Sequence, residues 1–198
     1  MRTFISIEIP ENIKDNIEKS IDEMKLMLSP LKWVDKKNLH ITLKFLGWVV
    51  DDKADDMISS VTDLAKGFGS IKINFAGLGV FPNARHPRVI WVGINEGSDR
   101  VKELAEKIDA RLSSEGYRKE EEREFSPHLT IGRIKEKIDV EPLSKFIEKN
   151  VMTEFGGFTA DHISVMKSTL RRSGPIYEEI KQVNLNPSPS PINRKREA

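Results

Sequence analysis

The chain is internally duplicated, and this repeat restricts its fold more than any other feature of the sequence. Arg2 and Arg88 are 86 residues apart, and His40 and His128 are 88 residues apart. Self-similarity at a nearly constant offset is typical of units that share one order of helices and strands. The sequence therefore predicts a molecule built from two like halves.

The hydrophobic pattern of the first half predicts the order β-α-β-α-β. Apolar residues alternate in residues 3–9 and 38–46, as they do in strands with one buried face. They recur at helical spacing in residues 10–28 and 51–66, and alternation returns in residues 71–75.

The second half repeats this order and adds one strand. We expect helices from Ser98 to just before Gly116 and over residues 139–149. The expected strands cover residues 88–94, 128–134, 158–170 and 176–183.

These patterns place the chain in the α+β class. We predict a bilobal molecule whose two pseudo-twofold-related β-α-β-α-β lobes, about residues 1–81 and 87–184, bring antiparallel sheets to face a central cleft. Together the lobes form one domain over residues 1–184. Residues 185–198 are rich in proline and basic residues, so we expect a disordered tail.

Composition narrows the classes of function. The 198 residues include 32 Lys and Arg against 31 Asp and Glu, so a net charge of +1 creates no overall field that attracts nucleic acid or anionic lipid. The absence of cysteine excludes disulfides, thiolate metal sites and thiol nucleophiles. No apolar run reaches the ~18 residues of a membrane span, and the segment 4–9 is too short for a signal peptide. We therefore predict a cytoplasmic monomer that binds no membrane.

One tetrapeptide pattern occurs on equivalent predicted strands of both halves. It reads His40-Ile41-Thr42-Leu43 in the first half and His128-Leu129-Thr130-Ile131 in the second. Because residues two apart on a strand share a face, the histidine and threonine of each motif point the same way and the apolar residues face the core. If the halves face each other, two imidazoles and two hydroxyls meet at one site.

This set of groups suits displacement at a phosphodiester. In-line attack at phosphorus needs a base on the entering oxygen and an acid on the leaving oxygen, and an imidazole with a pKa near 6.5 serves as either. The hydroxyls of Thr42 and Thr130 can donate to the non-bridging oxygens. The motifs are nearly symmetric, so spacing alone does not say whether His40 or His128 is the acid.

Two alternative roles for the histidines are a structural one and metal binding. A single histidine on a strand is usually packed or solvated, but its repetition favours function. The stronger alternative is a metal ion bound by both histidines. Neither motif has a second histidine or a carboxylate two residues away, so we expect neither a metal nor another cofactor.

Further segments carry a resemblance to a known family over residues 1 to about 184. They are Leu39–Gly47, Phe81-Pro82 with Pro87–Trp91, and Phe125–Ile131 with Arg133. With the two motifs, these segments resemble the 2H phosphoesterase superfamily, and within it the RNA 2′,3′-cyclic phosphodiesterase family, also called 2′-5′ RNA ligases.

The resemblance implies metal-free, ATP-independent opening of a terminal 2′,3′-cyclic phosphate on RNA to leave a 2′-phosphate. It also implies His40 as proton donor to the departing 3′ oxygen and His128 as acceptor from water. The implied partner is RNA with a cyclic phosphate end, tRNA halves among the candidates. Two alternatives stay open: the reverse reaction, which joins such an end to a 5′-hydroxyl through a 2′-5′ link, and noncatalytic binding of RNA or a nucleotide.

Side chains alternate between the two faces of a strand, so the parity of a residue, odd or even in number relative to the histidine, predicts its face. This strand parity gives different expectations for three residues near the motifs. Arg133 has the wrong parity for the site, but the family usually carries arginine there, so we expect a phosphate contact reached through strand twist or a bulge after Gly132. Lys44 shares the parity of His40, and we expect it to be solvated. Phe45 has the parity of the core, and we expect it to be packed.

The remaining candidates are assigned to structure. We expect Trp33 in the core or at its rim rather than stacked on a base, and His86 in a solvent-exposed loop. His162 is also expected to be structural, although His162-Ile163-Ser164-Val165 nearly matches the motif. Arg171 and Arg172 are predicted to lie in a solvated turn, with contact to substrate phosphates as the alternative.

Overall fold

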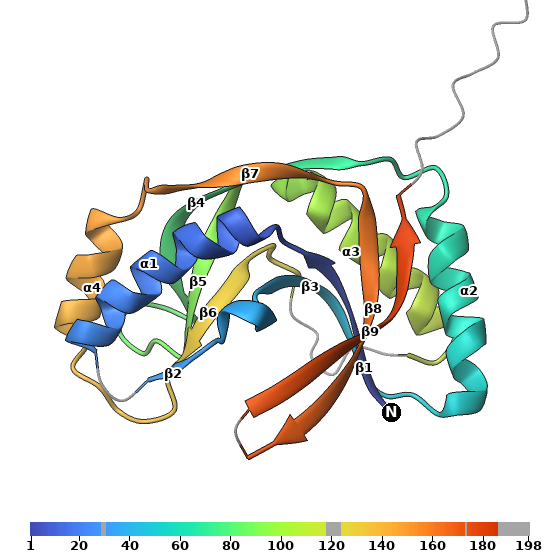
Figure 1. The fold of residues 1–198 in the computed structure, drawn as a ribbon, viewed down its shortest axis with the longest axis horizontal. Helices are drawn as coiled ribbons and strands as arrows, with labels where there is room; N and C mark the ends of the chain where they lie inside the picture. The colour runs from blue at the N-terminus through green and yellow to red at the C-terminus, as the bar shows by residue number, and fades with distance from the viewer. Residues whose placement is uncertain (29–30, 118–123, 173, 186–198) are drawn as a thin grey trace, which may run out of the picture.

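The structure contains two antiparallel sheets (Figure 1). It is a computed structural model, and it describes residues 1–28, 31–117, 124–172 and 174–185. Among these residues, four strands form sheet A, in the spatial order β3 (His40–Trp48), β1 (Arg2–Glu8), β8 (His162–Arg171) and β9 (Gly174–Asn184). Five strands form sheet B, in the order β2 (Lys32–Trp33), β6 (Leu129–Arg133), β5 (Val89–Glu96), β4 (Ile71–Phe81) and β7 (Glu154–Ala160).

Each sheet is covered by helices. In sheet B, α1 (Glu11–Met27) contacts β7 and α4 (Val140–Lys149) contacts β4. In sheet A, α2 (Ala54–Ala65) contacts β9 and α3 (Ser98–Ser114) contacts β3. Two 3-10 turns, η1 (Lys36–Asn38) and η2 (Asp51–Lys53), precede β3 and α2. In the described ranges, no helix combines the length and the apolar character that a membrane span needs.

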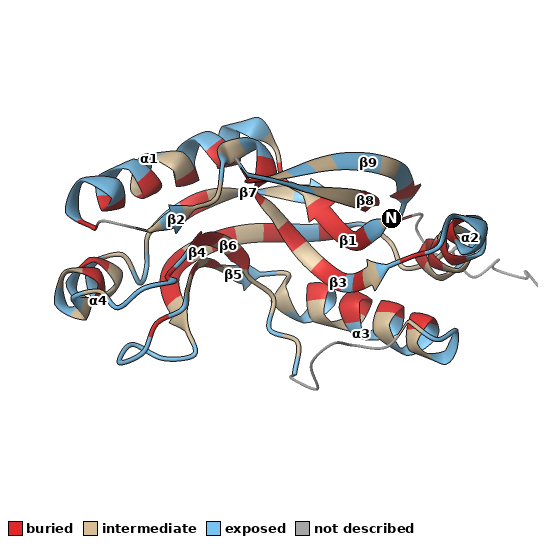
Figure 2. Cartoon of the chain, turned by 90° about the horizontal axis from the view of Figure 1, so that it is seen from below, coloured by how far each residue is buried: buried red, intermediate tan, exposed pale blue. Residues whose placement is uncertain are grey.

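The core lies between the helices and the sheets. Ile41 and Leu43 of the first motif and Leu129 and Ile131 of the second are at most 4% exposed, as strand parity predicts. The outer faces of the helices are exposed, whereas the buried residues gather on the strands and on the inner helix faces (Figure 2). The histidine and threonine of each motif therefore lie on the opposite face of their strand from the core.

The α+β class and the two antiparallel sheets are confirmed, and the strand order shows how the two halves of the sequence, about residues 1–81 and 87–184, contribute to each sheet. In sheet A, β1 lies between β3 of its own half and β8 of the other, and in sheet B, β4 lies between β5 and β7. Alternation of apolar residues shows that a strand has a buried face but does not show which strand it pairs with. The halves of the sequence thus exchange strands.

Two details of the elements also differ from expectation. The strand predicted over residues 158–170 is two strands, because the chain passes from sheet B to sheet A at Asp161. The two-residue strand β2 was not predicted, since so short a strand leaves no periodic signal. The predicted disordered tail concerns mainly residues 186–198, which lie outside the described residues.

Candidate active site

His40 stands at the start of β3 and is held by its own chain. Its Nδ1 donates to the carbonyl oxygen of Asn38 at 2.8 Å, and its Nε2 lies 3.0 Å from Oγ1 of Thr42. A carbonyl oxygen can only accept, so Nδ1 carries the proton of the neutral ring and Nε2 is the atom that can exchange one. The buried side chain of Asn38 in turn donates to the carbonyl oxygen of Pro175 in β9 at 3.2 Å.

His128 stands immediately before β6 in the same arrangement. Its Nδ1 donates to the carbonyl oxygen of Ser126 at 2.7 Å, again two residues back in the chain. The shared geometry fixes the same tautomer in both rings and leaves Nε2 of His128 for chemistry. The repeat seen in the sequence therefore extends to the hydrogen bonding of the two imidazoles.

Aromatic rings contact both histidines. The ring of Phe4 stacks on His40 with centroids 5.0 Å apart, and Tyr177 meets His40 edge-on at 5.3 Å. Phe81 meets His128 edge-on at 5.0 Å. These contacts fix the orientation of both imidazoles and remove water from them.

Burial controls the protonation of the two histidines. Loss of hydration lowers the pKa of His40 to about 4; the hydrogen bond to Asn38 opposes this shift, and the positive charges of Lys14 and Arg133 add to it. The pKa of His128 is also lowered, mainly by burial and further by Arg133. Both imidazoles are therefore neutral at pH 7, and an anionic phosphate beside them would favour their protonated forms.

A β-bulge interrupts each motif strand at the same place. The pairing of β1 with β3 passes from Ser6–Thr42 to Ile5–Lys44, so Leu43 has no residue opposite it. In β5 and β6 the pairing passes from Trp91–Thr130 to Ile90–Gly132, and Ile131 is left over. Each bulge follows its histidine by three residues and reverses the strand parity beyond it.

The bulges decide three sequence predictions. Arg133, five residues after His128, joins the face of His128 and Thr130, through a bulge that precedes Gly132 rather than following it. Lys44 is not solvated: it is 4% exposed and its Nζ lies 2.6 Å from Oδ1 of Asp109 in α3. Phe45 is not packed in the core but is 55% exposed. Both predictions are wrong because parity was counted through the bulge.

Arg133 connects the two motifs. Its charge lowers the pKa of both His40 and His128 and acts in the same direction on Tyr177, so one guanidinium lies within electrostatic range of all three rings. The strands β3 and β6 also contact each other although they belong to different sheets. The two motifs thus share one site that spans the two sheets.

Sequence reasoning missed two residues of this site. Phe45 occupies in the first repeat the place of Arg133 in the second, five residues after the histidine, and its ring lies 6.1 Å from that of Phe4. Alignment of the repeats could have identified it. Tyr177 comes from β9, far from either motif in sequence, and no local pattern marked it.

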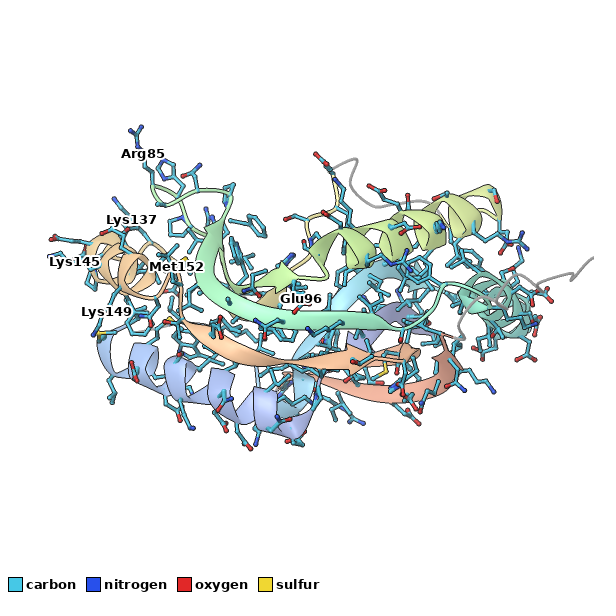
Figure 3. All side chains as sticks on the ribbon, turned by 90° about the horizontal axis from the view of Figure 1, so that it is seen from above. Arg85, Glu96, Lys137, Lys145, Lys149 and Met152 are labelled. Atoms are coloured by element: carbon cyan, nitrogen blue, oxygen red, sulfur yellow. The ribbon has the colours of Figure 1, made fainter. Side chains whose placement is uncertain are left out.

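Several candidates lie apart from the two imidazoles or contact other groups. Trp33 packs over Gly132 and, with α1, lines a cavity of about 150 Å³ that neither motif histidine borders. His162 donates from Nδ1 to Asp161 at 2.6 Å. His86 is exposed, as expected, and its neighbour Arg85 projects outward at the end of the molecule that carries α4 (Figure 3).

The hairpin of β8 and β9 extends beyond the rest of sheet A. β1 pairs with β8 only from Ser164 to Lys167, and the rest of β8 up to Arg171 pairs with β9 alone. Arg171 and Arg172 are exposed near its tip. Among the described residues, no group of three His, Cys, Asp or Glu side chains is placed to hold a metal ion.

Comparison of the sequence with known proteins agrees with this geometry. The family model described as the 2′-5′ RNA ligase superfamily matches residues 13–172. A protein of Methanocaldococcus jannaschii named RNA 2′,3′-cyclic phosphodiesterase is 43% identical over 92% of this chain and 99% of its own length. A protein of Methanothermobacter thermautotrophicus with the same name is 32% identical over 93% and 99%.

Solved structures show the same fold. TT0787 of Thermus thermophilus is similar with a TM-score of 0.78 and 24% identity, over 94% of this chain and 99% of that one. E. coli LigT complexed with 3′-AMP is similar with a TM-score of 0.73 and 21% identity, over 93% and 97%. The expected resemblance is confirmed: the chain belongs to the 2′-5′ RNA ligase superfamily and, within it, to the family of RNA 2′,3′-cyclic phosphodiesterases.

Proposed function

We propose that this protein hydrolyses the 2′,3′-cyclic phosphate end of RNA to a 2′-phosphomonoester, with His40 and His128 as the acid and base. The observation that carries the proposal is that Arg133 lies on the same face of β6 as His128 and Thr130, on a strand that contacts β3, which begins with His40. An arginine on the face that carries the motif histidine and threonine suits a phosphate anion. The curated relatives bear the name of this activity, and a protein of the same fold was solved with a nucleoside monophosphate bound.

The chemistry uses one proton at each imidazole. Nε2 of His128 takes a proton from the attacking water as its oxygen bonds to phosphorus. Nε2–H of His40 gives a proton to the 3′ oxygen as the bond between that oxygen and phosphorus breaks. Thr42 and Thr130 donate to the non-bridging oxygens, while Arg133 balances their charge. The choice of His40 as the acid rests on the family resemblance, because the two imidazoles are held alike.

The low pKa of His40 fits an acid that is charged by its substrate. In the free protein the ring is neutral at pH 7, because its pKa is about 4. A bound phosphate replaces the lost hydration with a negative charge, so the proton arrives together with the anion. The protonated Nε2 then lies beside the group that it must protonate.

Ligation is the second candidate, and the name of the matching superfamily favours it. The same groups can join a cyclic phosphate to a 5′-hydroxyl, because microscopic reversibility reverses the role of each imidazole. The reaction would be ligation if the site held a 5′-hydroxyl, such as that of a second tRNA half, and excluded water. It would be hydrolysis if water reached the phosphate instead. We further propose that the protein acts as a cytoplasmic monomer, on the support of its near-neutral charge and lack of cysteine.

The test is incubation of the purified protein, in EDTA, with a short RNA ending in a 2′,3′-cyclic phosphate, followed by phosphorus NMR. A 2′-monophosphate is the expected product. A 3′-monophosphate would reverse the leaving oxygen and the roles of the histidines. Failure to form any product would contradict hydrolysis and favour binding alone. Addition of an RNA with a 5′-hydroxyl to the same mixture tests ligation.

A further inference from the structure

The active-site face of β3 continues beyond the catalytic motif as a row of exposed aromatic side chains. A second bulge leaves Leu46 without a partner, since the pairing passes from Phe4–Phe45 to Thr3–Gly47. Trp48 then pairs with Arg2. Arg2 and Phe4 are two residues apart on β1 and so share a face, which places Trp48 on the same face as Phe45 and His40.

The exposure of these rings is unusual for a strand at the edge of a sheet. Phe45 is 55% exposed and Trp48 is 82% exposed, on a strand that pairs with β1 on one side and, within the described part of the chain, with no strand of sheet A on the other. Edge strands are usually protected by charged residues, because exposed apolar edges promote association. Two exposed aromatic rings on this edge strand, continuous with the active site, indicate a surface that binds a planar group.

Positive charge accompanies the row. Arg2 lies opposite Trp48, and the charges of Arg2 and Arg133 both act on Tyr177, the ring that touches His40. One of these arginines comes from sheet A and the other from sheet B. Aromatic rings that alternate with cations are the usual means of binding single-stranded nucleic acid, because bases stack on the rings and phosphates pair with the cations.

The spacing along the strand suits successive nucleotides. The Phe4 and Arg2 positions that face the two rings are about 7 Å apart, at about 3.3 Å per residue. With the terminal phosphate at His40 and His128, Phe45 is the nearer ring and Trp48 the farther one. A chain that enters along β3 therefore brings its last nucleotide to Phe45 and the preceding one to Trp48.

We infer that Trp48 and Arg2 form a binding site for the nucleotide that precedes the cyclic phosphate end. Trp48 stacks on the base of that nucleotide, and Arg2 pairs with the phosphate that links it to the last one. The protein therefore favours single-stranded 3′ ends of at least two nucleotides over a 2′,3′-cyclic mononucleotide. The inference rests on the proposed hydrolysis and adds to it a preference for substrate length.

The test compares kcat/KM for a cyclic mononucleotide and for a dinucleotide with the same 3′ base and a 2′,3′-cyclic phosphate. We expect the native protein to favour the dinucleotide. Trp48→Ala should lower the ratio of dinucleotide to mononucleotide on the order of tenfold, mainly through KM, because one stacked base is lost. Trp48→Phe should restore most of the ratio. Arg2→Gln should weaken the dependence of the dinucleotide KM on salt.

Leu26→Ala is the matched control, because Leu26 is an apolar side chain 89% exposed at the end of α1. It should leave the ratio unchanged. Hydrolysis of both substrates with a ratio that Trp48→Ala does not alter would overturn the inference and leave the proposed function intact. Hydrolysis of neither substrate would overturn both. A dimer that forms with rising concentration and is dissolved by Trp48→Ala would show that a second copy, not RNA, covers the ring.

Discussion

At the scale of single residues, the two imidazoles are held alike but surrounded differently. Both donate from Nδ1 to the carbonyl two residues back, whereas Phe4 and Tyr177 enclose His40 and Phe81 contacts His128. Identical restraint fixes the tautomer, and unequal surroundings allow opposite protonation states in one reaction. This asymmetry is the property that a paired acid and base require.

Removal of either imidazole tests this pairing. His40→Ala and His128→Ala should each lower kcat by about 10²- to 10⁴-fold, because each removes one proton transfer from the rate-limiting step. The double variant should be less impaired than the product of the two losses, since the groups act as a unit. His162→Ala is the control, because that histidine pairs with Asp161. Near-native turnover in either single variant would refute the two-histidine mechanism.

Arg133 gives a prediction about pH. Its charge lowers the pKa of both histidines, so Arg133→Met should raise both pKa values and move the bell-shaped profile of kcat/KM to higher pH. Arg133→Lys keeps the charge and should keep the profile, but it should raise KM because the planar fork is lost. A profile that stays in place in the methionine variant would mean that Arg133 does not act on the catalytic rings.

At the scale of elements, the bulges set the composition of the site. They place Phe45 and Arg133 on the face of the motif histidines and turn Lys44 inward to Asp109. Most helices and strands could be predicted from the sequence, because the periodicity of apolar residues is a local signal. The internal repeat drew attention to both motifs. It could not place the residues beyond each bulge, since a bulge depends on pairing with a neighbouring strand. The bulge in β6 places Arg133 on the face of His128, where strand parity did not place it, and its contact with a phosphate stays a prediction.

The buried ion pair on the core side tests the first bulge. Asp109→Asn should lower the free energy of unfolding by about 3 kcal/mol, because the Lys44 ammonium stays buried beside a neutral amide. Adding Lys44→Met should recover much of this loss. Denaturant unfolding measures both. A solvated Lys44, as expected from the sequence, would instead leave the stability of Asp109→Asn within about 0.5 kcal/mol of the native protein.

At the scale of the whole molecule, the exchange of strands couples the two halves. Each sheet contains strands of both halves, so neither motif strand can complete its sheet without the other half of the chain. The site forms where β3 of one sheet contacts β6 of the other. The charge of Arg133 in β6 lowers the pKa of His40 in β3. Folding of the sheets and assembly of the site are consequently one event.

This coupling predicts how the chain behaves when it is divided. Residues 1–83 and 84–185 expressed separately should each lack a cooperative thermal transition by circular dichroism, because β1 loses β8 on one side and β4 loses both of its partners, β5 and β7. Mixed together, they should regain the transition and the activity. The control is the intact chain cleaved after folding at an engineered protease site in the exposed segment 82–86, which should stay folded. A half that unfolds cooperatively by itself would show that the halves are independent lobes after all.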